Sequence, residues 1–223
     1  MSFVKLKDNE TTSSAEAIYS AHALDGDVKQ LERYYSDWAK TYNKDVAEEC
    51  YEGPVRIVEY FLKFRREHHG ERVNANYRIL DVGCGTGLVG QAFAAKGHPP
   101  IEGCDISEEM VQIAEKTGVY HSLEGNVDAN DMNNIENDQY DSVLSAGVFT
   151  LGHVQPNALE ELIRITKPGG LIIVNTRRSY YEKTDMQSVC DGLETEGKVQ
   201  ILCQKILPYI ADEEAHYWAL KVA

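Results

Sequence analysis

The stretch that most constrains the fold is RILDVGCGTG, residues 78–87, in which a short apolar run containing one acid leads into three alternating glycines. Such a run is typical of a buried strand. Gly83, Gly85 and Gly87 let the backbone approach a ligand closely, because glycine carries no Cβ atom. The helix-like segment that follows would direct its N-terminal N–H groups toward the same place. The stretch therefore predicts a strand, a turn and a helix that together bind a polar ligand.

The rest of the chain continues the alternation of strands and helices. Strand-like runs such as IEGCDI, YHSLEGN, YDSVLSAG and LIIVNT follow at intervals, with helix-like segments between most of them and a turn expected at KPGG. This rhythm indicates βαβ units and a doubly wound, mostly parallel sheet, so the predicted fold class is α/β. Near the end, KVQILCQKI and AHYWALKVA are separated by a proline and an acidic turn, which predicts an antiparallel pair at the sheet edge.

The segment before the first strand divides into a tail and two expected helices. Residues 1 to about 25 are polar and rich in small side chains, which is typical of a loosely held tail. Helical spacing of apolar residues follows in 27–46 and again in 54–70. We therefore expect an N-terminal tail and helical lid in residues 1–45 and a ligand-binding domain in residues 46–223.

Charge and composition exclude several classes of partner. Lys and Arg number 22 against 36 Asp and Glu, a net charge of −14, which repels nucleic-acid phosphates and anionic membrane surfaces. Neither nucleic acid nor membrane is an expected partner, and no run approaches the ~20 apolar residues of a membrane span. The five cysteines have no metal-like spacing, so no metal site is expected. Reduced thiols and the lack of a signal-like apolar core favour a cytoplasmic protein; the oligomeric state stays open.

The glycine turn alone leaves two ligand classes open. Gly85, Gly87 and Gly90 form G-x-G-x-x-G, and Asp105 follows Gly85 by twenty residues, as in dinucleotide-binding folds. Asp81, however, lies two residues before the first glycine, where a carboxylate suits a cationic group better than a pyrophosphate. A nicotinamide-dependent oxidoreductase is therefore the weaker enzyme alternative. A non-catalytic nucleoside-binding partner protein is a third reading, because a fold does not prove chemistry.

Three motifs in order, ILDVGCGTG, GCDIS and ITKPGGLIIV, resemble those of class I S-adenosylmethionine-dependent methyltransferases. Among the subfamilies, ELIRITKPGGLIIVNTR is most similar to the Williams–Beuren-region methyltransferase-like proteins. The resemblance implies a Rossmann-like sheet of seven strands with a reversed C-terminal edge strand, and S-adenosylmethionine as cofactor. It also implies methyl transfer to an O or N nucleophile of a small-molecule acceptor, mainly by proximity and orientation.

By this resemblance, the cofactor would be held by residues from both the sheet and the aromatic helix. The glycine turn would form the floor, Asp81 would hold the ammonium, and Asp105 with Ile106 would hold the ribose. Asn126 with Val127 is slightly favoured over Asp128 for the adenine. The remaining expected contacts are the backbone of Ser145 and Ala146 and the stripe of Tyr34, Trp38 and Tyr42, whose alternative role is core packing.

Residues after the fourth and fifth strands are the candidates for acceptor binding and catalysis. His153 is the candidate general base, since an imidazole titrates near neutral pH, although a structural packing role is the stronger alternative. The expected acceptor contacts are Phe149, Arg177, Arg178, Tyr180 and Tyr181. These five lie where open α/β sheets bind ligands, at the carboxyl ends of strands; core packing and solvated loop positions are their alternatives.

Overall fold

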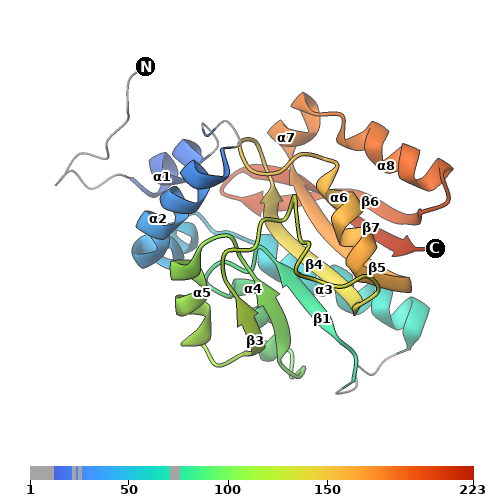
Figure 1. Cartoon of the computed structure of the whole chain (residues 1–223). Helices are drawn as coiled ribbons and strands as arrows, with labels where there is room; N and C mark the ends of the chain where they lie inside the picture. The colour runs from blue at the N-terminus through green and yellow to red at the C-terminus, as the bar shows by residue number, and fades with distance from the viewer. Residues whose placement is uncertain (1–12, 22–23, 25–26, 71–75) are drawn as a thin grey trace.

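A computed structural model of the chain describes residues 13–21, 24, 27–70 and 76–223. Its centre is a seven-stranded sheet in the order β3-β2-β1-β4-β5-β7-β6 (Figure 1). The strands are β1 (Ile79–Val82), β2 (Ile101–Cys104), β3 (Tyr120–Glu124), β4 (Tyr140–Phe149), β5 (Thr166–Arg177), β6 (Val199–Ile210) and β7 (Glu213–Val222). The first five strands run parallel, and β7 runs antiparallel to both β5 and β6.

The predicted fold class is confirmed, with one refinement of the strand order. The C-terminal strand is reversed, as expected, but it lies between β5 and β6, so that β6 is the outermost strand. The KPGG segment, expected to be a turn, lies within the N-terminal end of β5. Gly169 has a φ of +79°, and the register between β4 and β5 shifts between Tyr140 and Ser142, so the expected turn is kept as an irregularity at the start of this strand.

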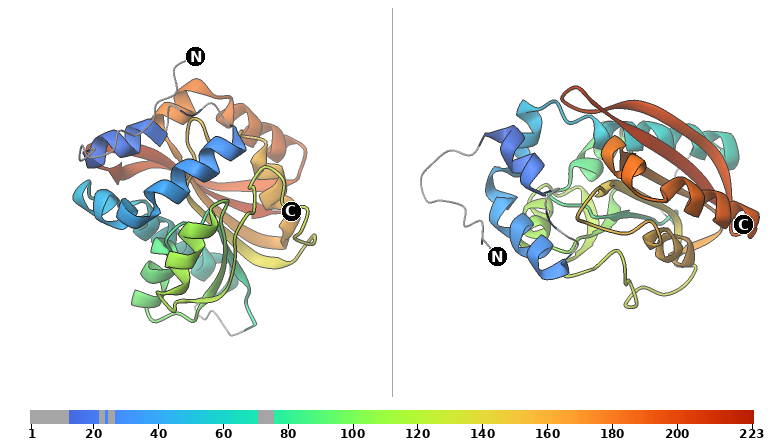
Figure 2. Two further views of the ribbon diagram at one scale, coloured as in Figure 1. Left: turned by 60° about the vertical axis from the view of Figure 1, so that its left-hand side comes forward. Right: turned by 90° about the horizontal axis from the view of Figure 1, so that it is seen from above.

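Helices cover both faces of the sheet. They are α1 (Ser14–Ala21), α2 (Val28–Glu48), α3 (Gly53–His69), α4 (Leu88–Ala95), α5 (Glu108–Glu115), α6 (Ala158–Ile165), α7 (Arg178–Lys183) and α8 (Met186–Thr195). In the views of Figure 2, α1 and α2 lie together at one end of the sheet. None of the described helices is long and apolar enough to cross a membrane.

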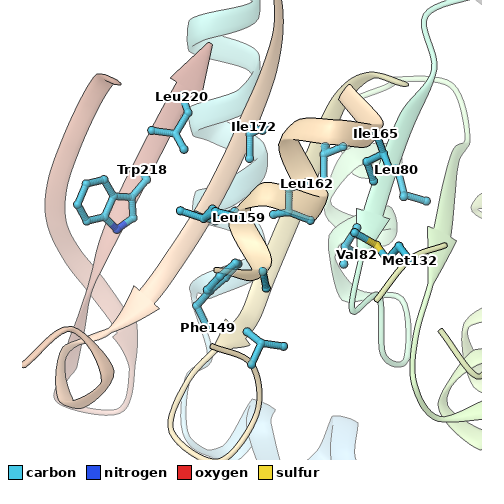
Figure 3. Packing of buried hydrophobic residues seen from close by; sticks show 14 of the residues in the cluster. Leu80, Val82, Met132, Phe149, Leu159, Leu162, Ile165, Ile172, Trp218 and Leu220 are labelled. Carbon is cyan, nitrogen blue, oxygen red and sulfur yellow. The ribbon is translucent and has the colours of Figure 1, made fainter. Parts of the chain in front are cut away.

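Two apolar cores, one on each face, hold the layers together. Ile172 of β5 belongs to the core beneath α6 and α8, whereas its neighbours Leu171 and Ile173 belong to the core beneath α3 and α4. Figure 3 shows the first core, with Leu159 and Leu162 of α6 lying over the strands. Because successive strand residues point to opposite faces, a strand buried on both sides must be apolar throughout. The burial of β5 on both faces explains why residues 171–174, LIIV, are all apolar.

Local sequence signals define the helices that surround the ligand-binding end of the sheet. Asp27 caps α2, since its side chain accepts hydrogen bonds from the backbone N–H groups at 29 and 30. Ser107 caps α5 by accepting from Met110 N. The expected tail of residues 1–25 includes α1, and its first twelve residues lie outside the described part. The expected division after residue 45 falls inside α2, which continues to Glu48.

Candidate active site

A cavity lies at the carboxyl ends of β1, β2 and β4, under α2, and has a volume of about 950 Å³ including the part open to solvent. Eleven of the sequence-predicted site residues line it: Trp38, Tyr42, Gly83, Gly85, Asp105, Ile106, Val127, Asp128, Ala146, His153 and Arg177. The remaining walls come from α1, the segment before α3, and the region where β6 ends.

The glycine turn forms the floor of this cavity. Gly83 has a φ of +71°, and a Cβ atom there would lie 2.1 Å from Cγ2 of Val148 in β4, so a side chain cannot be placed unless the Val148 side chain moves. At Gly85, also in the left-handed region, a Cβ would meet nothing within 4 Å. Gly85 thus leaves open space beside the backbone, which is what close approach of a ligand requires.

Asp105 connects the glycine turn to the end of β2. Its Oδ2 accepts a hydrogen bond from Gly85 N at 2.7 Å, and its Oδ1 accepts from Ser107 N at 2.9 Å. Burial raises the pKa of this carboxyl, and the backbone N–H donors oppose that shift. Each carboxylate oxygen retains a second lone pair. The position therefore suits a carboxylate that also accepts hydrogen bonds from ligand hydroxyls.

Asp81 lies directly behind the glycine turn and is fully buried. Its Oδ2 accepts a hydrogen bond from the Tyr120 hydroxyl at 2.7 Å, and the same hydroxyl accepts from Gly90 N at 3.0 Å. Within the described part of the chain, its Oδ1 has no hydrogen-bond partner. Burial raises the pKa of Asp81 from 3.8 to about 7, while the Tyr120 hydrogen bond lowers it. A buried, unpartnered carboxylate oxygen is costly unless a cation or donor reaches it.

The face of α2 that lines the cavity differs by one residue from the aromatic stripe predicted from the sequence. Tyr35, Trp38 and Tyr42 line the cavity. Tyr34, predicted to contact the cofactor, instead donates a hydrogen bond to the Ala17 carbonyl of α1 and is not among the lining residues. Positions i, i+3 and i+7 share a helix face as readily as i, i+4 and i+8, so the packing of α1 on α2 decides which stripe faces the cavity.

Three hydrogen bonds connect α2 to three different loops around the cavity. Asn43 accepts a hydrogen bond from Thr86 in the glycine turn. The hydroxyls of Ser36 and Ser107 are 3.2 Å apart, which connects α2 to the end of β2. Nearer the helix start, the Tyr35 hydroxyl lies 2.7 Å from Nε2 of His153, in the loop after β4. The helix therefore covers the carboxyl ends of β1, β2 and β4.

The loop predicted to contact the adenine contains two candidate residues, Asn126 and Asp128, and the structure places them differently. Val127 and Asp128 line the cavity, and Val127 N donates to the Asp105 carbonyl at 3.0 Å. Asn126 is not among the lining residues; it has a φ of +59°, and its side-chain amide lies 3.5 Å from Glu108. The structure thus favours Asp128, whereas the sequence slightly favoured Asn126.

Among the predicted acceptor contacts, Arg177 alone lines the cavity. Phe149 and Tyr180 are each 1 % exposed in the core under α6 and α7. Arg178 forms an exposed ion pair with Glu182 on α7. Tyr181 stacks on His216, with ring centroids 3.6 Å apart. Because α7 begins directly after β5, it carries Arg178, Tyr180 and Tyr181 away from the cavity. Three further predicted cofactor contacts, Asp81, Gly87 and Ser145, also lie outside the lining.

Several lining residues were not predicted from the sequence. Tyr51 and Tyr209 come from segments far apart in the chain, and their hydroxyls approach Gly147, where a Cβ would lie 2.7 Å from one and 3.1 Å from the other. Thr150 also lines the cavity. Gly147, in the stretch SAGV, is the signal that the sequence offers, because a glycine allows another segment to approach the backbone closely. Among the described residues, no group of three or more His, Cys, Asp or Glu side chains is placed to hold a metal ion.

Comparison with known proteins decides the family. A family model described as "Methyltransferase domain" matches residues 73–219. This chain belongs to the S-adenosylmethionine-dependent methyltransferases. Methyltransferase-like protein 27 of Homo sapiens is 31% identical over 183 residues, covering 81% of this chain and 72% of that protein. This relative agrees with the predicted subfamily resemblance.

More distant methyltransferase relatives carry out O-methylation according to their names. The malonyl-(acyl-carrier protein) O-methyltransferase of Erwinia pyrifoliae is 31% identical, with 61% of this chain and 53% of that protein covered. The ubiquinone biosynthesis O-methyltransferase of Rickettsia akari is 27% identical, with 67% and 60% covered. The chain therefore spans between half and two thirds of the length of these two relatives.

Solved structures confirm the fold. The cyclase SpnF superposes with a TM-score of 0.65 at 17% identity, over 89% of this chain and 97% of that one. A TehB-like methyltransferase from Corynebacterium glutamicum gives a TM-score of 0.59 at 16% identity, over 86% and 99%. At these identities the likeness concerns the fold alone, and it agrees with the Rossmann-like sheet predicted from the sequence.

The residues present fit the cofactor that the family implies, S-adenosylmethionine. The unpartnered Oδ1 of Asp81 is a buried acceptor near the glycine turn and suits an ammonium group. Asp105 suits ribose hydroxyls, and the faces of Trp38 and Tyr42 suit a sulfonium, because aromatic faces attract cations. When bound, the cofactor supplies a methyl group that its sulfonium makes electrophilic. The protein's own contribution is to hold an acceptor in line with that group and to exclude water.

Proposed function

We propose that this methyltransferase acts on an O or N nucleophile of a small molecule, and that residues 1–45 contribute a lid over its site. The observation that carries the proposal is the shape of the cavity. It extends from the glycine turn past Gly147 into a space closed by α1, α2 and the end of β6. A wall built from Ile18, Leu31 and Ile210 leaves room for a compact, largely apolar acceptor.

The chemistry of the walls supports alignment as the main source of rate enhancement. Holding two reactants in a reactive geometry can lower a barrier by ~7–11 kcal/mol in favourable systems. The aromatic side chains of α2 are held in place by packing: Trp38 donates from Nε1 to Asp45 at 2.7 Å, and its ring contacts that of Tyr42 with centroids 4.7 Å apart. Such a wall restricts both the cofactor and the acceptor.

The charge balance and the names of relatives support a small-molecule acceptor. A net charge of −14 opposes binding to nucleic acid. The ubiquinone biosynthesis relative is named as an O-methyltransferase, which supports an oxygen nucleophile here. All five cysteines are free thiols, which supports the proposed cytoplasmic location.

The proposal is tested by measuring product formation. Isothermal titration calorimetry with S-adenosylmethionine and, separately, NAD establishes ligand choice, and we expect binding of the first alone. A panel of small-molecule hydroxyl and amine compounds is then incubated with the protein and S-adenosylmethionine, and released S-adenosylhomocysteine is measured by mass spectrometry. Transfer to RNA or to a protein, with no transfer to any compound of the panel, would contradict the proposal.

A further inference from the structure

The acceptor end of the cavity contains a short polar segment in an otherwise apolar wall. The loop after β4 contributes Thr150 and His153, which are 3 % and 8 % exposed, and His153 N donates to the Thr150 carbonyl at 3.2 Å. Both residues line the cavity, as do the apolar side chains of Leu31, Val154 and Ile210. Polar groups in such a setting decide which part of an acceptor is held there.

The hydrogen bonds of His153 determine its tautomer. Nδ1 lies 3.0 Å from the Leu151 carbonyl oxygen, which only accepts, so Nδ1 carries the proton. Nε2 then presents its lone pair to the Tyr35 hydroxyl at 2.7 Å, and this hydroxyl donates to it. Burial lowers the pKa of His153 to about 4, in agreement with a neutral ring. The oxygen of Tyr35, which also lines the cavity, retains lone pairs that can accept a further hydrogen bond.

Thr150 supplies an independent observation at the same place. Its Oγ1 is buried and has no hydrogen-bond partner among the residues that the structure describes. A buried hydroxyl without a partner is unfavourable, and a ligand atom that hydrogen-bonds to it removes that cost. The helix α2 and the loop after β4 therefore offer two points of contact to an acceptor, the Tyr35 oxygen as hydrogen-bond acceptor and the Thr150 hydroxyl as donor or acceptor.

The charges around the cavity argue against an ionic acceptor. Among the described lining residues, the carboxylates are Asp105 and Asp128, both at the cofactor end, and the cation is Arg177. Arg177 donates from Nε and Nη2 to both carboxylate oxygens of Glu213, so its charge is neutralised within the protein. An acceptor carboxylate or ammonium in this apolar space would need a charged partner of its own.

We propose that the acceptor is a neutral, largely apolar molecule with a phenolic or enolic hydroxyl. Tyr35 takes the proton of this hydroxyl and passes its own proton to His153, and Thr150 hydrogen-bonds to the acceptor. The proposal rests on the function proposed above and narrows its substrate class. Tyr35 is then a catalytic residue, Thr150 a binding residue, and His153 a residue that acts through Tyr35.

The step balances in atoms and charge. The acceptor oxygen forms a bond to the methyl carbon as the bond from that carbon to sulfur breaks, and the electron pair of the broken bond stays on sulfur. The hydroxyl proton moves to the Tyr35 oxygen, and the original Tyr35 proton moves to Nε2 of His153. The positive charge lost at sulfur thus reappears on the imidazolium only transiently, because burial lowers the pKa of His153 to about 4 and the ring gives the proton to water as soon as the site opens.

Matched probes test the substrate class without knowledge of the natural acceptor. They share a propylphenyl group: 4-propylphenol, 4-propylbenzylamine and 4-propylbenzoate. Calorimetry on the protein loaded with S-adenosylhomocysteine measures binding, and mass spectrometry measures methyl transfer from S-adenosylmethionine. We expect the phenol to bind and to be methylated in preference to the other two. Preference for the amine or the carboxylate, or no binding of any of the three by loaded protein, would refute the class assignment.

Variants then test the roles of the residues. Proton transfer by a positioned side chain contributes ~10²–10⁴-fold, so Tyr35→Phe should lower kcat for 4-propylphenol at least ~100-fold with the affinity for S-adenosylmethionine unchanged. His153→Gln keeps an acceptor for the Tyr35 hydroxyl but cannot take its proton, so it should lower kcat and leave KM unchanged. Thr150→Val should raise KM, and Thr150→Ser should restore it. Tyr60→Phe, on α3 outside the cavity, is the control.

A second phenol separates proton transfer from structural damage. 4-Nitrophenol can bind as the neutral phenol but gives up its proton far more readily than 4-propylphenol, so the loss in Tyr35→Phe should be much smaller with it than with 4-propylphenol. Equal losses with the two phenols, or full activity of the Tyr35→Phe and His153→Gln variants, would overturn the proton route. Failure of the wild-type protein to bind S-adenosylhomocysteine would instead refute the function proposed above, which keeps the two failures distinct.

Discussion

Substitution of Asp81 should show that its buried carboxylate lowers the free energy of unfolding when no cofactor is bound. The pKa of this buried carboxyl is raised from 3.8 to about 7, chiefly by burial. A folded-state pKa above the unfolded value means that the folded protein binds the proton more tightly. The stability that protonation of Asp81 contributes is therefore fully present below about pH 4 and is lost as the pH rises through about 7. At 1.36 kcal/mol per pKa unit, the loss is about 4 kcal/mol.

Asp81→Asn removes this titration while keeping an oxygen that can accept from Tyr120. In the absence of cofactor, we expect the variant to be more stable than the wild type at about pH 9, by up to about 4 kcal/mol, because no charged carboxylate is buried. The difference should shrink as the pH falls toward about 4. Urea unfolding followed by far-ultraviolet circular dichroism at a series of pH values measures it. Asp37→Asn, exposed on α2, is the control for an ordinary surface substitution.

The same variant should bind S-adenosylmethionine more weakly. A hydrogen bond to a charged group contributes ~1.5–3 kcal/mol, which corresponds to roughly 10–150-fold in affinity. Calorimetry should thus show weaker binding in the variant that is more stable without ligand. If Asp81→Asn is destabilised by the same amount at every pH, or binds the cofactor as tightly as the wild type, the reasoning from the unpartnered Oδ1 is refuted.

Other substitutions and ligands test the remaining contacts. Asp105→Ala should lower the affinity for S-adenosylmethionine about tenfold or more and also lower the melting temperature, because two backbone N–H groups lose their acceptor; unchanged affinity in a folded variant would place the ribose elsewhere. Asp128→Ala should weaken cofactor binding more than Asn126→Ala, since Asp128 alone of the pair lines the cavity, and the opposite ranking in calorimetry would restore the sequence-based choice. Addition of S-adenosylmethionine should change the fluorescence of Trp38 in a Trp218→Phe background, whereas a silent Trp38 would argue against its place in the cofactor wall. DNA and RNA should not bind at moderate salt, given the net charge of −14; micromolar binding that weakens with salt would contradict this.

The parts of the site that depend on local sequence could be predicted, because their geometry is set within a few residues. The glycine turn and the carboxylate of Asp105 each lie at the end of a strand within one strand–turn–helix unit. The aromatic helix was also recognised, but its orientation was not. Tyr34 and Tyr35 are adjacent, and the choice between them depends on the contact with Ala17 of α1 and with His153. Neither contact leaves a signal in the helix sequence itself.

The acceptor end could not be predicted, because it is assembled from segments distant in sequence. Tyr51 precedes α3 and Tyr209 lies near the end of β6, yet their rings meet in an edge contact with centroids 5.1 Å apart. Their hydroxyls occupy the space that a side chain at Gly147 would need. A glycine with positive φ after a strand indicates that something approaches closely, but the long-range packing decides what approaches. The two tyrosines therefore explain why position 147 carries no side chain, and substituting either tyrosine should change the space around Gly147 that is open to an acceptor.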